Sequence, residues 1–122
     1  QIKFKLPKNF YEIFEKIYEF ISNKNIHLNN FKYYPFKQLM QNDIKSTFFT
    51  DIQNKIMIHL LLNQDSGVEK IELIKNIWPK DKEIFLNKLD THLTNLKNQI
   101  YNDLNYDIKF SSKSGILKLS IN

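Results

Sequence analysis

The chain has 122 residues, which is enough for one compact core and too few for two ordinary domains. A composition that is 42% hydrophobic argues against wholesale disorder, and the absence of cysteine excludes a disulfide framework and a thiolate metal site. The net charge of +5 favours a polyanionic partner.

All 18 positively charged side chains are lysines, and the sequence contains no arginine. The many asparagines and isoleucines beside them suggest an AT-rich genome in which lysine codons have replaced arginine codons. This substitution has a physical consequence. Lysine is a point charge and cannot form the bidentate fork that arginine makes to guanine.

No membrane partner is expected for this chain. The longest apolar run, residues 56–62, contains His59 and is far shorter than the roughly 20 residues that cross a bilayer. Together with the lack of cysteine, this favours a cytoplasmic location.

The first predicted element is an amphipathic helix over residues 10–21. Its apolar side chains recur at steps of three and four, at Phe10, Ile13, Phe14, Ile17, Tyr18 and Ile21. Residues 22–25 end this helix and form a short joint. From residue 26 to residue 49, short aromatic-rich runs alternate with turn residues, which predicts a small antiparallel sheet.

Three helices are predicted next. Thr50, with Gln53 three residues later, predicts a capping box at the start of the first helix. The second begins after Gly67 and ends at Trp78, because Pro79 disfavours the helical conformation of the residue before it. The third follows Asp81 and covers about residues 84–102. Its apolar stripe comprises Phe85 or Leu86, Leu89, Leu93, Leu96 and Ile100.

A β-hairpin is predicted to close the chain, with a turn at residues 111–115 and a lysine-bearing tip. Its two alternating runs are Tyr106, Ile108 and Phe110, then Leu117, Leu119 and Ile121. The whole order predicts an α+β fold of the winged helix-turn-helix kind. An amphipathic helix (residues 1–25, with its joint) precedes a domain (residues 26–122) with an N-terminal antiparallel sheet, a three-helix core and a hairpin wing.

Three motifs of the sequence resemble the OmpR/PhoB-type effector domains of bacterial response regulators, over about residues 26–120. Residues 49–53, Phe-Thr-Asp-Ile-Gln, are similar to the "Leu-Thr-x-x-Glu" that opens the first effector helix. Residues 67–78 resemble the second helix, which ends in an apolar residue followed by tryptophan. Residues 89–100 resemble the recognition helix in its alphaproteobacterial form, "Leu-Glu-Thr-His-Ile-Tyr-Arg-Leu-Arg-x-Lys-Ile".

The resemblance implies a sequence-specific transcriptional regulator that binds double-stranded DNA. Residues 84–102 would enter the major groove, and the wing at residues 111–118 would lie beside the minor groove. It also implies a homodimer, RNA polymerase as a partner, and phosphorylation of an upstream receiver domain. Residues 6–10 are similar to the "Lys-Pro-Phe" that ends a receiver's last strand. Residues 10–21 are then either the receiver's final helix or an ordinary helix packed on the effector sheet.

The candidate DNA-binding side chains lie on the polar face of the third helix and on the hairpin. Asparagine can bond adenine bidentately, threonine can contact thymine, and lysine can neutralise phosphates. The candidates are Lys88, Thr91, Thr94, Asn95, Lys97, Asn98, Lys113 and Lys118. A solvated helix face is the plain alternative interpretation of the same polar residues.

A second hypothesis is a winged-helix module that has lost DNA binding and contacts a protein. Asn95 and Lys97 stand where the family shows arginine, and the wing keeps only Gly115 of the family's "Gly-Tyr-Arg-Leu". An enzyme, a metal site and a cofactor are not expected. His27, His59 and His92 share no metal-ligand spacing. Trp78, the pair Tyr33-Tyr34 and the pair Phe48-Phe49 are expected to be core residues.

Overall fold

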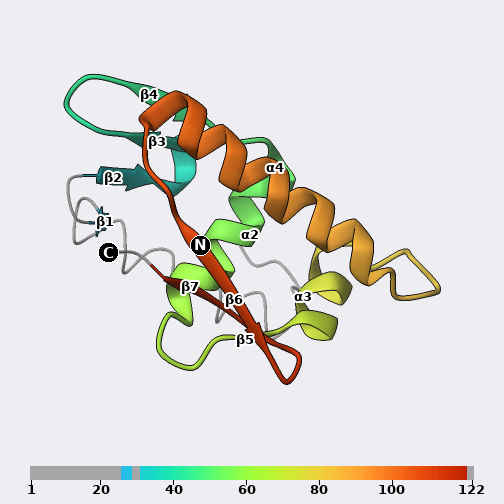
Figure 1. Ribbon diagram of the computed structural model, residues 1–122. Coiled ribbons are helices and arrows are strands. Elements are labelled where there is room, and N and C mark those ends of the chain that lie inside the picture. Colours follow the sequence, from blue (N-terminus) through green and yellow to red (C-terminus); the bar gives the residue numbers. More distant parts are fainter. Residues whose placement is uncertain (1–25, 29–30, 121–122) are drawn as a thin grey trace, which may run out of the picture.

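The computed structural model describes residues 26–28 and 31–120 (Figure 1). The predicted helix at residues 10–21, its joint and the receiver-like motif lie outside these residues. The first half of the described chain holds β1 (Ile26–Leu28), β2 (Phe31–Tyr34), the 3-10 helix η1 (Pro35–Lys37), β3 (Leu39–Gln41) and β4 (Ser46–Phe48). The second half holds α2 (Asp51–Leu62), β5 (Val68–Glu69), α3 (Lys70–Ile77), α4 (Leu86–Leu104), β6 (Lys109–Lys113) and β7 (Ile116–Ser120).

The predicted N-terminal sheet is confirmed as a four-stranded antiparallel meander in the order β1-β2-β3-β4. Tyr33 pairs with Met40, and Met40 pairs with Thr47 on the next strand. Because neighbouring side chains in paired register share a face, these three residues lie on one side of the sheet, and all three are buried. The alternate row faces outward. Phe48 belongs to that row and is 67% exposed, so the expectation that it is a core residue is wrong.

The predicted capping box at the start of α2 is confirmed. The backbone N–H of Gln53 donates to Oγ1 of Thr50 at 3.2 Å, and the backbone N–H of Thr50 donates to Oε1 of Gln53 at 3.0 Å. These bonds satisfy two donors that would otherwise have no partner at the helix end. The helix then buries Ile56, Met57 and Leu60 in the core.

The long helix α4 begins later than the sequence predicts. Ile84, Phe85 and Leu86 continue the apolar period, yet they are 41%, 47% and 49% exposed. Among the described residues, no side chain caps the helix start and no core element covers these three side chains. The helical pattern alone therefore does not make them part of the buried stripe. From Leu89 onward the stripe is buried as predicted, and it extends to Leu104. Asn105 then adopts a left-handed backbone conformation, with φ of 54°, and ends the helix.

The C-terminal sheet has three strands in the order β5-β7-β6, of which β5 was not predicted. Val68 and Glu69, expected at the start of the second helix, pair instead with Leu117 and Ile116. The hairpin turn is also tighter than predicted, because β6 continues to Lys113 and only two residues connect it to β7. Ser114 and Gly115 both have positive φ, 55° and 78°, as the tight turn of a twisted hairpin requires.

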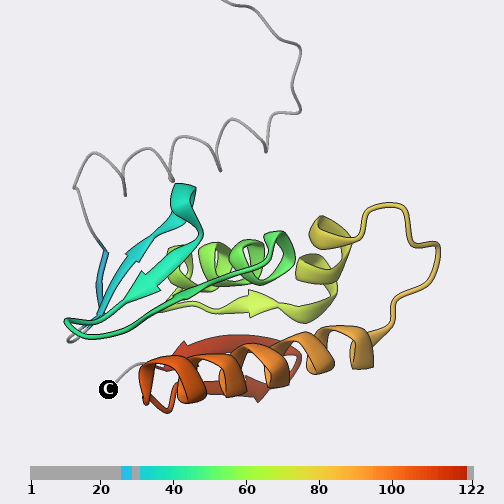
Figure 2. The ribbon, with the colours of Figure 1, turned by 90° about the horizontal axis from the view of Figure 1, so that it is seen from above.

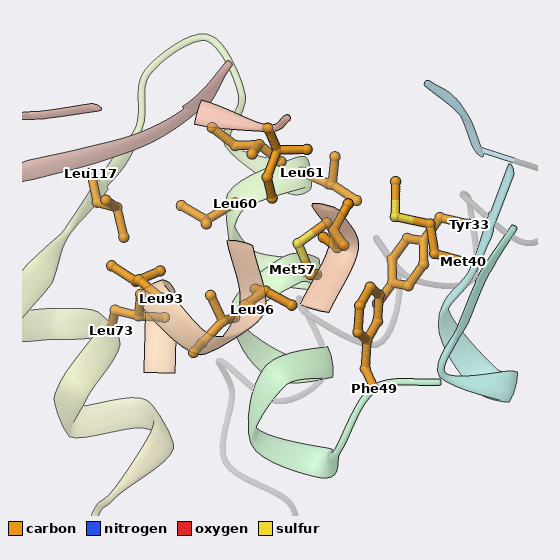
Figure 3. Close-up of a cluster of buried hydrophobic side chains, with 14 of the residues drawn as sticks. Tyr33, Met40, Phe49, Met57, Leu60, Leu61, Leu73, Leu93, Leu96 and Leu117 are labelled. Carbon is orange, nitrogen blue, oxygen red and sulfur yellow. The ribbon is translucent and has the colours of Figure 1, made fainter. Parts of the chain in front are cut away.

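One core joins the two sheets to the three helices, as Figure 3 shows. Leu60, Leu73, Leu93, Leu96 and Leu117 meet between α2, α3, α4 and the C-terminal sheet. Tyr33, Met40, Phe49 and Met57 extend the cluster to the N-terminal sheet. No helix within the described residues is long and apolar enough to cross a membrane.

Candidate nucleic-acid interface

From Leu89 to its end, helix α4 has one buried side and one solvent-exposed side. It runs along the margin of the molecule, where no other described element covers its outer side (Figure 2). The buried side carries Leu89, Leu93, Leu96, Ile100 and Leu104. These side chains pack on α2, α3 and the sheets, so the orientation of the helix is fixed by the core.

The opposite side of α4 presents a stripe of uncharged polar side chains. Thr91, Thr94, Asn95 and Asn98 are all exposed, and their spacing of three and four residues places them on one helix face. Four of the eight predicted DNA-binding residues are therefore brought together. Oγ1 of Thr91 donates to the backbone carbonyl of Asn87 at 2.9 Å, which uses its hydroxyl proton and leaves its methyl group free.

The two predicted lysines of α4 lie against carboxylates of this same chain. Nζ of Lys88 is 3.0 Å from Oδ2 of Asp81 and 4.6 Å from the ring centre of Trp78. Nζ of Lys97 is 3.7 Å from Oδ1 of Asp107. Both pairs are partly exposed, so each contributes only about 0–1 kcal/mol to stability. Their main effect is to neutralise the two positive charges locally.

The acidic residues of α4 are partnered as well. Oδ1 of Asp90 is 3.3 Å from Nζ of Lys70, and Oδ2 of Asp103 accepts a hydrogen bond of 2.7 Å from Thr47. Each charged side chain in the sequence of α4 thus has a partner outside the helix. In the described structure, the exposed stripe therefore offers neutral groups: the amides of Asn95 and Asn98, the hydroxyl of Thr94 and the methyl groups of both threonines.

A polar network fixes the middle of α4 against α2 and β4. Nε2 of Gln53 donates to Oε1 of Gln99 at 2.9 Å. Nε2 of Gln99 lies 2.8 Å from both Oγ1 of Thr47 and the carbonyl of Phe48. Gln53 and Thr47 are buried, where an unpartnered polar group is costly, so the network constrains how far α4 can shift.

The indole of Trp78 joins α3 to α4. It is partly buried against the core, and its ring centre lies 5.4 Å from that of His92. His92 therefore packs against the indole of Trp78. Nδ1 of His59 lies 2.7 Å from the carbonyl of Lys55, one turn earlier in α2. Among the described residues, no group of three or more histidines and acidic residues could hold a metal ion.

The outer face of the hairpin is cationic. Leu117 and Leu119 point into the core, so the alternate positions of β7 and their partners on β6 point outward. This outer face, here called the wing face, comprises Lys109, Ser111, Lys113, Ile116, Lys118 and Ser120. None of its three lysines forms an ion pair with a described residue. Lys113 and Lys118 were predicted; Lys109 was missed, although it lies two and four positions from Ser111 and Lys113 and so shares their side of the strand.

One part of the wing face, at Ile116 and Lys118, lies against the turn between α2 and β5. A shallow pocket there is lined by Ser66, Ser111, Lys113, Ser114, Ile116 and Lys118. Gly67 makes the close approach possible. A Cβ atom at this position would lie 2.5 Å from Cγ2 of Ile116 and 2.7 Å from Cγ of Lys118, and the φ of Gly67 is +78°. The wing therefore has a fixed position relative to the helices.

Solved structures that are similar to this chain include two bacterial domains. The DNA-binding domain of CadC from E. coli superposes with a TM-score of 0.64 at 12% identity, over 80% of this chain and 92% of that domain. The C-terminal domain of the nisin resistance regulator NsrR, a lantibiotic response regulator, gives a TM-score of 0.60 at 23% identity, over 79% of this chain and 96% of that domain. This chain has the winged-helix fold of these two domains.

Within the winged-helix fold, α3 and α4 form the helix-turn-helix pair and the β6–β7 hairpin is the wing. The sequence resemblance therefore predicted the fold correctly. No protein-family model matches the chain, and neither does any curated protein. Similarity to the winged-helix structures therefore concerns the fold.

Proposed function

We propose that this chain is the DNA-binding output domain of a transcriptional regulator. Helix α4 enters the major groove with Thr91, Thr94, Asn95 and Asn98 toward the bases, and the wing contacts the backbone beside the minor groove. The observation that carries this proposal is the stripe of exposed hydrogen-bonding side chains on α4, with the lysines of the wing face on the same domain. Neither surface presents an unpaired carboxylate to a polyanion.

The names of the two similar structures support the same function. One is described as the DNA-binding domain of CadC and the other as the C-terminal domain of a response regulator. By extension, this domain acts as a homodimer on paired half-sites in the cytoplasm, follows a receiver domain in the intact protein, and contacts RNA polymerase. The proposed function requires the domain only to bind DNA, so the proposal includes no cofactor and no catalytic role.

A winged-helix module that binds a protein is the second candidate. The observation that favours it is a group of exposed apolar side chains at the starts of α3 and α4. Ile71 is 47% exposed and lines a pocket together with Leu86, which is 49% exposed. Ile84 and Phe85, just before Leu86 in the sequence, are 41% and 47% exposed. Exposed apolar clusters of this kind are typical of protein-binding surfaces.

The experiment that separates the candidates is fluorescence anisotropy of the 122-residue chain with random duplex DNA, from low to physiological salt. The proposal predicts binding that weakens steeply as salt rises, because counterions are released from neutralised phosphates. A triple variant with Lys109, Lys113 and Lys118 changed to alanine should lower the salt slope by about three. Absence of binding by a folded sample at low salt would contradict the proposal.

A matched control uses three lysines that belong to neither surface. Lys32, Lys37 and Lys55 are exposed on β2, η1 and α2. Their triple alanine variant has the same net charge as the wing variant. If both triple variants lost the same affinity, the binding would reflect net charge and not the wing face.

A further inference from the structure

The charges of this domain are divided unequally between its two candidate DNA-contacting surfaces. On α4, Lys88, Asp90, Lys97 and Asp103 each have a partner within the protein, so the exposed stripe is electrically neutral. On the wing face, Lys109, Lys113 and Lys118 lack an ion-pair partner among residues 31–120. The two surfaces therefore differ in what they can recognise.

The stripe on α4 offers groups that suit adenine and thymine. Within the described part of the chain, the amides of Asn95 and Asn98 have no hydrogen-bond partner. Asparagine can donate to N7 and accept from N6 of adenine through one bidentate contact only if its amide is free in this way. Thr91 and Thr94 add methyl groups, of the kind that pack against the C5-methyl of thymine.

The spacing of the two asparagines fits neighbouring base pairs. Residues three apart in a helix are separated by about 4.5 Å along its axis. Base pairs in B-form DNA are about 3.4 Å apart. Asn95 and Asn98 can thus reach adjacent positions of one site without bending the helix.

The same stripe lacks what guanine recognition uses. A guanine presents two acceptors, O6 and N7, which arginine or lysine contacts as a donor. The chain has no arginine, and both lysines of α4 are directed to Asp81 and Asp107. Selecting guanine with this face would require breaking an ion pair for each contact.

We propose that α4 selects A·T base pairs through Asn95 and Asn98, with Thr91 and Thr94 contacting thymine, while phosphate attraction comes from the lysines of the wing face. This inference rests on the proposed DNA-binding function and specifies its substrate class. Base preference and salt dependence are then properties of different parts of the domain, and mutation can change one without the other.

The test begins with selection of bound duplexes from a random pool, using the 122-residue chain. The expected consensus is rich in A·T pairs. Replacing one central A·T pair of that consensus by G·C should weaken binding about tenfold, since one bidentate contact contributes on the order of a factor of ten in discrimination. A consensus dominated by G·C pairs would overturn the inference.

Two variants locate the selectivity. Asn95→Ala should lose about tenfold on the consensus and leave the affinity for non-consensus DNA and the salt slope unchanged. Asn95→Arg should move the preference at the same position from adenine to guanine, because the guanidinium of arginine can donate to both O6 and N7 of guanine. Asn95 is exposed, so both variants should fold. Lys113→Ala is the control and should weaken consensus and non-consensus DNA alike.

The outcomes distinguish this inference from the function on which it rests. Salt-dependent binding with no base preference, or with equal losses for Asn95→Ala on every sequence, overturns A·T selection by α4 and leaves DNA binding intact. Absence of any binding at low salt overturns both. A preserved preference in Asn95→Ala, Asn98→Ala double variants would equally exclude the asparagines as its source.

Discussion

Gln53 of α2 donates a hydrogen bond of 2.9 Å to Gln99 of α4, and Nε2 of Gln99 lies 2.8 Å from the hydroxyl of Thr47 on β4. One side chain of α4 thus contacts a buried polar group on each of the two other elements. Gln99→Ala should leave the amide of Gln53 and the hydroxyl of Thr47 without this partner. We expect the free energy of unfolding to fall by about 1–3 kcal/mol in urea denaturation.

The neighbouring residue provides the control for this variant. Asn98 is exposed and has no partner among the described residues, so Asn98→Ala should change stability by less than about 0.5 kcal/mol. Equal effects of the two substitutions would mean that the network around Gln99 does not stabilise the fold.

The capping box of α2 predicts a smaller loss of stability. Thr50→Ala removes the oxygen that accepts the N–H of Gln53 and should cost about 1 kcal/mol in the same denaturation assay. Thr50→Ser keeps that oxygen and should retain most of the stability. If serine and alanine behaved alike, the hydroxyl would not be the stabilising group.

Gly67 and Gly115 have the same backbone φ of +78° but different surroundings. Alanine at either position incurs strain of about 1 kcal/mol from the left-handed conformation. Only at Gly67 would the new Cβ also collide with β7, whereas nothing lies within 4 Å of it at Gly115. Gly67→Ala should therefore lower the melting temperature more than Gly115→Ala, as measured by circular dichroism. The reverse order would contradict the close contact between the turn and β7.

Tyr33 should make stability depend on pH in alkaline solution. Its hydroxyl donates to Oδ1 of Asn54, and burial raises the pKa of the hydroxyl above its usual value of 10.0. Since the folded protein then holds this proton more tightly than the unfolded chain, the stability is fully present below pH ~10 and is lost as the pH rises further. Tyr33→Phe removes this contribution. The free energy of unfolding measured from pH 8 to 11 should fall less steeply in the variant than in the unchanged protein.

The two kinds of lysine on the candidate interface give the last prediction. Lys113→Ala should reduce the slope of log affinity against log salt by about one, because Lys113 has no ion-pair partner in the described structure. Lys97→Ala should change the slope by clearly less, since Asp107 already neutralises that ammonium. Anisotropy titrations of both variants check this. Equal slope changes would show that Lys97 leaves Asp107 to bind phosphate.

Local patterns predicted the helices better than the strands. The capping box at Thr50 and the stripe from Leu89 to Ile100 depend on residues close in sequence, so they could be recognised without the fold. Strand β5 could not, because two residues carry no period and Val68 becomes a strand residue only by pairing with Leu117. The start of α4 was misplaced for a related reason: whether Phe85 is buried depends on what the core places opposite it.

The sequence could predict which residues share the exposed face of α4, but not which of its charged side chains are paired. Helical spacing alone grouped Thr91, Thr94, Asn95 and Asn98. The pairing of Lys88 with Asp81 depends on how residues 79–85 fold back, and the pairing of Lys97 with Asp107 depends on where the chain leaves α4. Neither follows from periodicity, which is why both lysines were grouped with the free cations of the wing.

The two-residue strand β5 also has a consequence for how the domain is made. The backbone N–H of Lys70, the first residue of α3, donates to the carbonyl of Gly115 in the hairpin turn at 2.9 Å, and β7 is the one described strand with which β5 pairs. During synthesis on the ribosome, α3 thus leaves the exit tunnel well before the strand that supports its first turn. The N-terminal sheet and α2 can form early, whereas the helix-turn-helix pair reaches its final arrangement only after β7 has emerged.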